Sequence, residues 1–99
     1  MGIVKILIDR ASNGVKEDVD YLMSLLTDET ELAMTRFVDY ALSFVKREEG
    51  VERMEFYLFN GTLIQRNYCA LYFNRKDDWK IVQVAYKQGL VDEIQTFAR

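Results

Sequence analysis

A short polar and aromatic stretch carries the side chains best suited to binding chemistry in this chain. It begins with Gln-Arg-Asn at 65–67 and continues through tyrosines one and five positions later. An arginine presents a fork of N–H donors that fits a carboxylate or phosphate, and amides and hydroxyls can complete a small polar pocket. We therefore take this stretch as a candidate binding surface in which Arg66 would hold an anion. Its members are Gln65, Arg66, Asn67, Tyr68, Tyr72 and Arg75.

The same side chains also have a structural explanation. If they lie near the start of a largely buried helix, their polar groups need partners inside the protein. Arg66 and Asn67 would then bond to a neighbouring helix end or carboxylate, and the tyrosines would lie at the edge of the core with their hydroxyls in water. Because structural polar networks are common, this interpretation stands beside the functional one.

The composition excludes the commonest catalytic and metal chemistry. The chain has no histidine and one cysteine, so it contains no Ser-His or Cys-His catalytic pair and no zinc site built from those ligands. Its acidic pairs lie at the ends or surfaces of predicted helices, where carboxylates favour solubility and the helix dipole. Its five glycines are scattered singly, so no phosphate-binding loop is present. We expect no catalytic residue, no metal site and no cofactor.

Length and composition predict a single domain over residues 1–99. A hydrophobic fraction of 49% and an aromatic fraction of 13% supply enough apolar side chains for one core, in which we expect Cys69 to be buried. The apolar run near the start is broken by Lys5, and no run approaches the roughly 20 apolar residues that cross a bilayer. We therefore expect a soluble, cytoplasmic protein that does not enter a membrane.

Two helices are predicted in the first half of the chain. Val15 to Leu26 places its apolar residues on one side, as an amphipathic helix does. A second helix follows, with Thr27 and Asp28 as candidate caps and Gly50 as its end. Its predicted core stripe consists of Met34, Phe37, Val38, Ala41, Leu42 and Val45.

The second half contains one clear helical pattern and one ambiguous segment. Trp79 to Lys87 alternates poorly as a strand but groups its apolar residues on one helical face. Gly89 fits a Schellman ending, and Asp92 can cap a last short helix. Val51 to Phe59 fits a helix or a short strand equally well, as does Ile3 to Ile8 near the start of the chain.

The stretch from Asn60 to Phe73, NGTLIQRNYCALYF, decides the fold class. In one interpretation Gly61 ends a helix, and Thr62 caps the next one in a capping box with Gln65. In the other, Asn60-Gly61 forms the two-residue turn of a β-hairpin.

Whole-chain features favour the helical interpretation. Proline is absent, and four glycines each lie just beyond a candidate helix end. We therefore predict an all-α fold, a compact bundle or a stack of short antiparallel helices. The alternative is an α+β fold with a hairpin at Asn60-Gly61 and strands near 53–59, 62–73 and 79–86.

One segment resembles parts of two known folds. The run DDWKIVQVAYKQGLVD resembles the second helix of an ankyrin-type hairpin, in which an Ile-Val pair and a terminal glycine recur, although the Thr-Pro-Leu-His signature is missing before it. Its Trp-Lys-Ile-Val part also resembles the terminal strand of cystatin-like α+β folds. The first resemblance implies a helix and the second a strand, and neither implies a function.

The leading functional hypothesis is a non-enzymatic interaction or regulatory module that binds another protein or a second copy of itself. It rests on the missing catalytic chemistry and on thirteen aromatic residues, which can cover more surface than one small core needs. A second hypothesis is a nucleic-acid-binding helix-turn-helix around 62–88, which the net charge of -3 disfavours. A third is an enzyme or ligand-binding domain with a pocket near Arg66.

Overall fold

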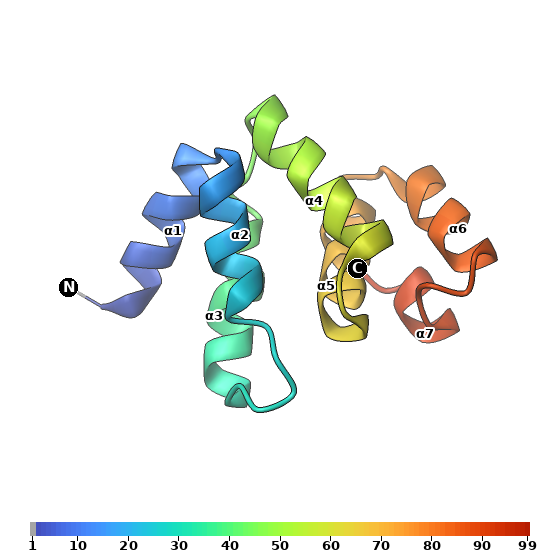
Figure 1. Cartoon of the computed structure of the whole chain (residues 1–99), viewed down its shortest axis with the longest axis horizontal. Helices are drawn as coiled ribbons and strands as arrows, with labels where there is room; N and C mark the ends of the chain where they lie inside the picture. Colours follow the sequence, from blue (N-terminus) through green and yellow to red (C-terminus); the bar gives the residue numbers. More distant parts are fainter. Residues whose placement is uncertain (1) are drawn as a thin grey trace. The chain divides into compact units, whose positions relative to one another are not determined.

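The computed structural model describes residues 2–99, and all regular structure in that range is helical (Figure 1). The all-α prediction is confirmed. The α+β alternative is wrong, and with it the strand that the cystatin-like resemblance implies. The helices are α1 (Ile3–Asn13), α2 (Lys16–Ser24), α3 (Leu32–Leu42), α4 (Glu48–Asn60), α5 (Leu63–Arg75), α6 (Trp79–Lys87) and α7 (Glu93–Thr96).

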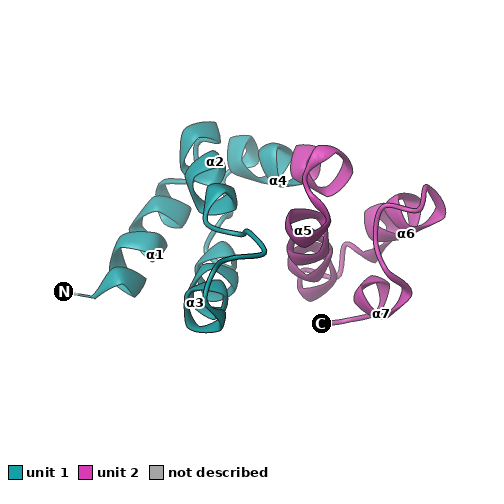
Figure 2. Ribbon diagram, turned by 60° about the horizontal axis from the view of Figure 1, so that its bottom comes forward, with its two compact units in different colours: residues 1–54 teal, residues 55–99 magenta. Residues whose placement is uncertain are grey.

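Contacts within the chain divide it into two compact units, which Figure 2 colours separately. The first unit extends to Met54 and the second runs from Glu55 to Arg99, so the division falls within α4. A single domain over residues 1–99 stays a prediction, and each unit is described by itself below.

In the first unit, α1 packs against both α2 and α3. Each of the three helices contributes a buried apolar stripe at helical spacing, which explains why the segments fold as helices against one another. In α1 the buried residues are Leu7 and Ala11, four positions apart, and this pair resolves the ambiguity of Ile3 to Ile8 in favour of a helix. The fully buried apolar residues of the other two helices are Val19, Leu22 and Met23 of α2 and Val38, Ala41 and Leu42 of α3.

The predicted end of the second helix at Gly50 is wrong, because α3 ends at Leu42 and Gly50 lies buried inside α4. A Cβ at Gly50 would lie 2.5 Å from the carbonyl oxygen of Gly14 and 2.8 Å from Cγ1 of Val45. This glycine therefore permits a close approach between two chain segments. Gly14 does end a helix, with φ at +64° and its N–H donated to the carbonyl of Arg10.

The predicted start of the second helix is also displaced. The helix begins at Leu32 after Glu31, rather than at Thr27 or Asp28. Thr27 and Thr30 instead form a hydrogen-bonded turn, in which the Thr30 hydroxyl donates to the carbonyl of Leu25 at 2.7 Å. Side-chain hydroxyls thus close the turn after α2 and leave the helix to start later.

In the second unit, α5 packs against α6 and α7. The capping box predicted before α5 is present: the Thr62 N–H donates to Oε1 of Gln65 at 2.9 Å, and the Gln65 N–H donates to Oγ1 of Thr62 at 3.4 Å. The core of the unit contains Leu58, Cys69, Ala70, Phe73, Val82 and Ala85. Leu58 belongs to α4, which settles Val51 to Phe59 as helix.

Both α5 and α6 end in Schellman motifs, so each helix stops sharply. After α6, the N–H of Leu90 donates to the carbonyl of Ala85, and Gly89 takes φ at +75°. After α5, the same bond pattern runs from Asp78 to Phe73, and Asp77 occupies the left-handed position with φ at 62°. The helix with a terminal glycine that the ankyrin-type resemblance implies therefore agrees with α6 and Gly89.

Within residues 2–99, no helix has the combination of length and apolar character needed to cross a membrane. The longest helices, α4 and α5, have 13 residues each.

Candidate functional site

Gln65 and Arg66 both make contacts at the turn that precedes α5. Gln65 completes the capping box with Thr62. Nε of Arg66 donates to the carbonyl oxygen of Leu90 at 2.6 Å, and its Nη1 donates to the carbonyl oxygen of Gly61 at 2.7 Å. The Arg66 guanidinium thereby ties the α4–α5 turn to the loop between α6 and α7.

Asn67 lies one position further along α5 and reaches the start of α7. Its Nδ2 lies 3.5 Å from a carboxylate oxygen of Asp92, while its buried Oδ1 has no hydrogen-bond partner within residues 2–99. Tyr68 is half-buried and Arg75 is exposed at the end of the helix.

Tyr72 belongs to the core of the second unit rather than to its surface, since only 4% of it is exposed. Its ring packs edge-on against Phe73 with centroids 5.1 Å apart, and its hydroxyl accepts a hydrogen bond from Nζ of Lys76 at 3.0 Å. Burial, with a smaller contribution from Cys69, raises the pKa of Tyr72 to about 12. Burial also raises the pKa of Cys69 well above its ordinary value. Neither group is an activated nucleophile at neutral pH.

The six predicted residues therefore lie along α5, and the contacts of Arg66 and Asn67 are those of the structural interpretation, a carbonyl at a helix end and a carboxylate. That they also form a binding surface stays a prediction. In a nucleic-acid-binding helix-turn-helix around 62–88, Arg66 would have to contact a phosphate, whereas its guanidinium already donates to two carbonyls.

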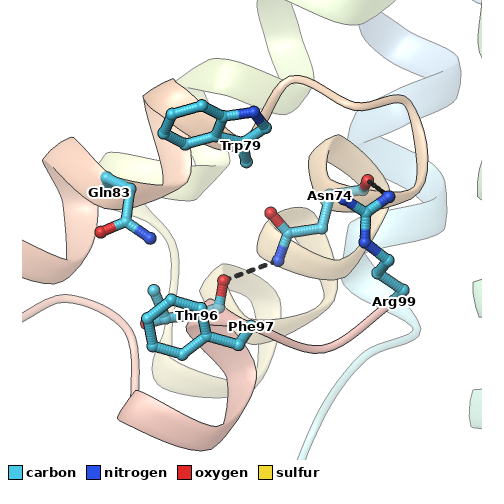
Figure 3. Close-up of a pocket in the computed structure, with 6 residues that line it drawn as sticks. All are labelled: Asn74, Trp79, Gln83, Thr96, Phe97 and Arg99. Atoms are coloured by element: carbon cyan, nitrogen blue, oxygen red, sulfur yellow. Dashed lines mark hydrogen bonds between the residues drawn. The ribbon is translucent and has the colours of Figure 1, made fainter.

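A pocket in the same unit lies at the other end of α5 (Figure 3). Its volume is about 330 Å³, near the lower end of the range for ligand pockets. It is bounded by the end of α5, one side of α6 and the chain around the end of α7. The lining residues are Asn74, Trp79, Gln83, Thr96, Phe97 and Arg99.

Asn74 forms the inner wall of this pocket and binds the chain around the end of α7. The residue is 3% exposed, and its Nδ2 donates to the carbonyl oxygens of Thr96 and Ala98 at 2.8 and 2.9 Å. These contacts fix which end of the amide is nitrogen, because both neighbours are acceptors. The opposite atom, Oδ1, has no hydrogen-bond partner within residues 2–99. In Figure 3 this oxygen points into the space between Trp79, Gln83 and Phe97.

Two aromatic side chains stand at the mouth of the pocket. Trp79, the first residue of α6, is 49% exposed, and Phe97, just after α7, is 67% exposed. The half-buried Gln83 lies one turn of α6 beyond Trp79. Exposed aromatic faces beside side-chain amides can hold a planar polar group.

Positive charge lies at the rim of the pocket. Nη1 of Arg99 donates to the backbone carbonyl of Asn74 at 3.3 Å and to the carboxylate of Asp77 at 2.7 Å. Nζ of Lys80 lies 5.9 Å from the centroid of the Trp79 ring. The Arg99–Asp77 pair is largely exposed, so it holds Arg99 in place only weakly.

The pocket offers binding groups rather than reactive ones. The one hydroxyl among its lining residues, that of Thr96, donates to the carbonyl of Asp92 at 2.8 Å. Within residues 2–99, no group of three or more His, Cys, Asp or Glu side chains is arranged to hold a metal ion.

Asp18 in the first unit is the most buried carboxylate of the described chain, with 5% exposed, but its contacts are structural. It accepts hydrogen bonds from Arg10, Asn13 and the backbone N–H of Val15, and so joins α1 to the start of α2. Burial alone would raise the pKa of Asp18, and these hydrogen bonds outweigh it, so the pKa lies below its ordinary value. A carboxylate held ionised in this way is not a general acid.

We compared the chain with protein-family models, with curated proteins and with solved structures, and none of the three comparisons gave a match.

The pocket was missed as a site at the sequence level, where Trp79 was assigned to an apolar helix face. One signal could have found it: Asn74 lies four positions after the buried Ala70 on the same face of α5. A polar residue on a buried stripe needs partners inside the protein. In this case the amide nitrogen has such partners, and the oxygen has none among the described residues.

Proposed function

We propose that this chain is a non-enzymatic binding module that captures a segment of another polypeptide in the pocket lined by Asn74, Trp79 and Phe97. The observation that carries the proposal is the exposure of Trp79 and Phe97 at the mouth of a pocket whose inner wall is a buried amide with one unpaired acceptor.

The composition of the pocket favours a polypeptide partner. Aromatic residues and arginine are enriched at protein interfaces and dominate their binding energy. Amide side chains such as Gln83 can pair with the N–H and C=O groups of a peptide backbone. With a volume of about 330 Å³, the pocket has room for one anchoring side chain, and the rest of the partner would lie across the rim.

A peptide selection tests this function. The whole chain is immobilised and random twelve-residue peptides displayed on phage are selected on it. Because the chain has one tryptophan, Trp79 gives a single indole N–H signal in a ¹⁵N-labelled sample, and peptides in the pocket should shift that signal. Phe97→Ala should weaken such peptides about tenfold, as expected for an interface hot spot.

A matched control separates the pocket from general surface hydrophobicity. Tyr40 of α3 is 55% exposed and belongs to the first unit, so Tyr40→Ala should leave the peptide affinity unchanged. The proposal is rejected if no peptide is enriched, or if enriched peptides bind Phe97→Ala as tightly as the wild type.

Self-association is tested in parallel by size-exclusion chromatography with light scattering. A concentration-dependent dimer that Phe97→Ala dissociates would identify the partner as a second copy of the chain. A monomer together with enriched peptides would identify a different polypeptide.

A further inference from the structure

We propose that the pocket of the second unit selects a neutral aromatic anchor with a ring N–H, that is, the indole of a tryptophan in the partner segment. This inference rests on the proposed function and specifies which side chain of the partner enters the pocket. Three features of the pocket and its surroundings support it: an unpaired acceptor, two aromatic faces and the cations of Arg99 and Lys80.

The unpaired acceptor calls for a donor. Oδ1 of Asn74 is buried without a hydrogen bond to any residue in the range 2–99, while Nδ2 on the same amide already donates to the carbonyls of Thr96 and Ala98. A buried acceptor without a partner is costly, so a ligand that brings an N–H to this atom gains more than one that brings an acceptor. The indole Nε1–H is a donor with no acceptor of its own to leave unsatisfied.

The depth of this oxygen also favours a large, flat anchor. Oδ1 of Asn74 has almost no exposed surface, so a ligand that bonds to it must displace the atoms that cover it. Phe97 is the more exposed of the two aromatic side chains at the mouth. An aromatic ring inserted between Trp79 and Phe97 can stack on both and carry its edge N–H inward.

The cations at the rim disfavour a charged anchor. An arginine or lysine side chain would also offer N–H groups and would stack on aromatic rings. It would however approach the guanidinium of Arg99, which lines the pocket, whereas the carboxylate of Asp77 that pairs with Arg99 is not among the lining residues and is 78% exposed. Nζ of Lys80 carries a second positive charge near the Trp79 ring. Because like charges repel, a neutral donor is the better fit.

Small probes that differ in one hydrogen-bond donor test the inference on the whole chain. Indole and 1-methylindole have the same ring system, and 1-methylindole carries a methyl group in place of the N–H hydrogen. In ¹⁵N-labelled protein, indole should shift the side-chain signals of Asn74, Gln83 and Trp79, and 1-methylindole should bind about tenfold more weakly because it leaves Oδ1 unpaired. Methylguanidinium and adenine, tested alongside, represent a cationic anchor and a nucleobase.

The outcomes are distinct from those of the peptide selection. Enriched peptides that share a tryptophan, and that lose about tenfold affinity when it is replaced by 1-methyltryptophan, would support the inference. Equal binding of indole and 1-methylindole, or tighter binding of methylguanidinium or adenine than of indole, would overturn it. If peptides bind the pocket but show no tryptophan, the binding function stands and the indole anchor is wrong. Asn74 is left intact throughout, because its Nδ2 contacts hold the floor of the pocket.

Discussion

The carbonyl oxygen of Gly14 lies 2.5 Å from the point where a Cβ on Gly50 would stand. An added methyl group would also meet Cγ1 of Val45 at 2.8 Å, so backbone or core must move to admit it. Overpacking typically costs about 1–3 kcal/mol, and the 2.5 Å approach to a backbone atom places this site in the upper part of that range, at about 2–3 kcal/mol. Alanine in a helix regains about 1 kcal/mol over glycine. We expect Gly50→Ala to lower the free energy of unfolding by about 1–2 kcal/mol in urea titrations followed by circular dichroism.

Gly89→Ala is the matched control for that variant. A Cβ at Gly89 meets nothing within 4 Å, and only its φ of +75° opposes a side chain. Its cost should be about 1 kcal/mol, from backbone strain alone. A Gly50→Ala protein as stable as the wild type would show that the contact with Gly14 is not constrained.

The Thr62 capping box should contribute about 1 kcal/mol to stability. Thr62→Ala removes the acceptor for the N–H of Gln65 and should lower the free energy of unfolding by that amount, whereas Thr62→Ser keeps the hydroxyl and should change little. Denaturant melts of the two variants decide the point. Equal stability of the alanine and serine variants would mean that the capping hydrogen bonds contribute nothing.

Gly61 precedes Thr62, and the close packing around its Cα, rather than a positive φ, is what favours glycine at this position. A glycine that ends a helix usually takes a left-handed φ, but the glycines with positive φ in the described chain are Gly14 and Gly89. A Cβ on Gly61 would lie 2.7 Å from the carbonyl of Tyr57 and 2.9 Å from Oε1 of Gln65. The position is crowded, and its backbone conformation is open to other residues.

Contacts between residues close in sequence could be predicted, and contacts between residues far apart in sequence could not. The capping box at Thr62 and the Schellman ending at Gly89 involve bonds across three to five residues, so sequence spacing encodes them directly. Gly50 was misassigned because its contact is with Gly14, 36 positions earlier. The pocket was missed for the same reason, since Asn74 meets its partners more than 20 residues later.

Asp77 offers a stabilising substitution. It ends α5 in the left-handed region with φ at 62°, where most residues are strained and glycine is not. Its side chain pairs with Arg99, but the two side chains are 78% and 61% exposed, so the pair contributes little. We expect Asp77→Gly to raise the free energy of unfolding by about 0.5 kcal/mol.

The neighbouring Asp78 provides a control of opposite sign. Its φ of -96° is ordinary, so Asp78→Gly should lose about 0.5–1 kcal/mol through the entropy of the unfolded chain. Urea titrations of both variants at neutral pH check the prediction. A destabilised Asp77→Gly would indicate that the Arg99 contact is stronger than its exposure implies.

As the pH rises, ionisation of the Cys69 thiol should destabilise the folded protein at a lower pH than ionisation of the Tyr72 hydroxyl does. Burial raises the pKa of the Cys69 thiol above its ordinary value of 9.0, so the unfolded chain releases this proton at a lower pH than the folded chain. The contribution of the protonated Cys69 thiol to the free energy of unfolding is complete below pH 9. Above pH 9 the free energy of unfolding should fall by about 1.4 kcal/mol for each pH unit. Tyr72, whose pKa is raised from 10.0 to about 12, should add to the loss only above pH 10.

The test compares the wild type with Cys69→Ala in urea titrations between pH 7 and pH 10. The variant should be less stable at pH 7, because it leaves a small cavity in the core. It should lose less stability on going to pH 10, because it has no buried thiol to ionise, so the difference between the two proteins should shrink. Tyr72→Phe should leave the pH dependence below pH 10 unchanged. A constant difference between wild type and Cys69→Ala from pH 7 to pH 10 would mean that the thiol ionises as readily in the folded protein as in the unfolded chain, and that the core around α5 admits water.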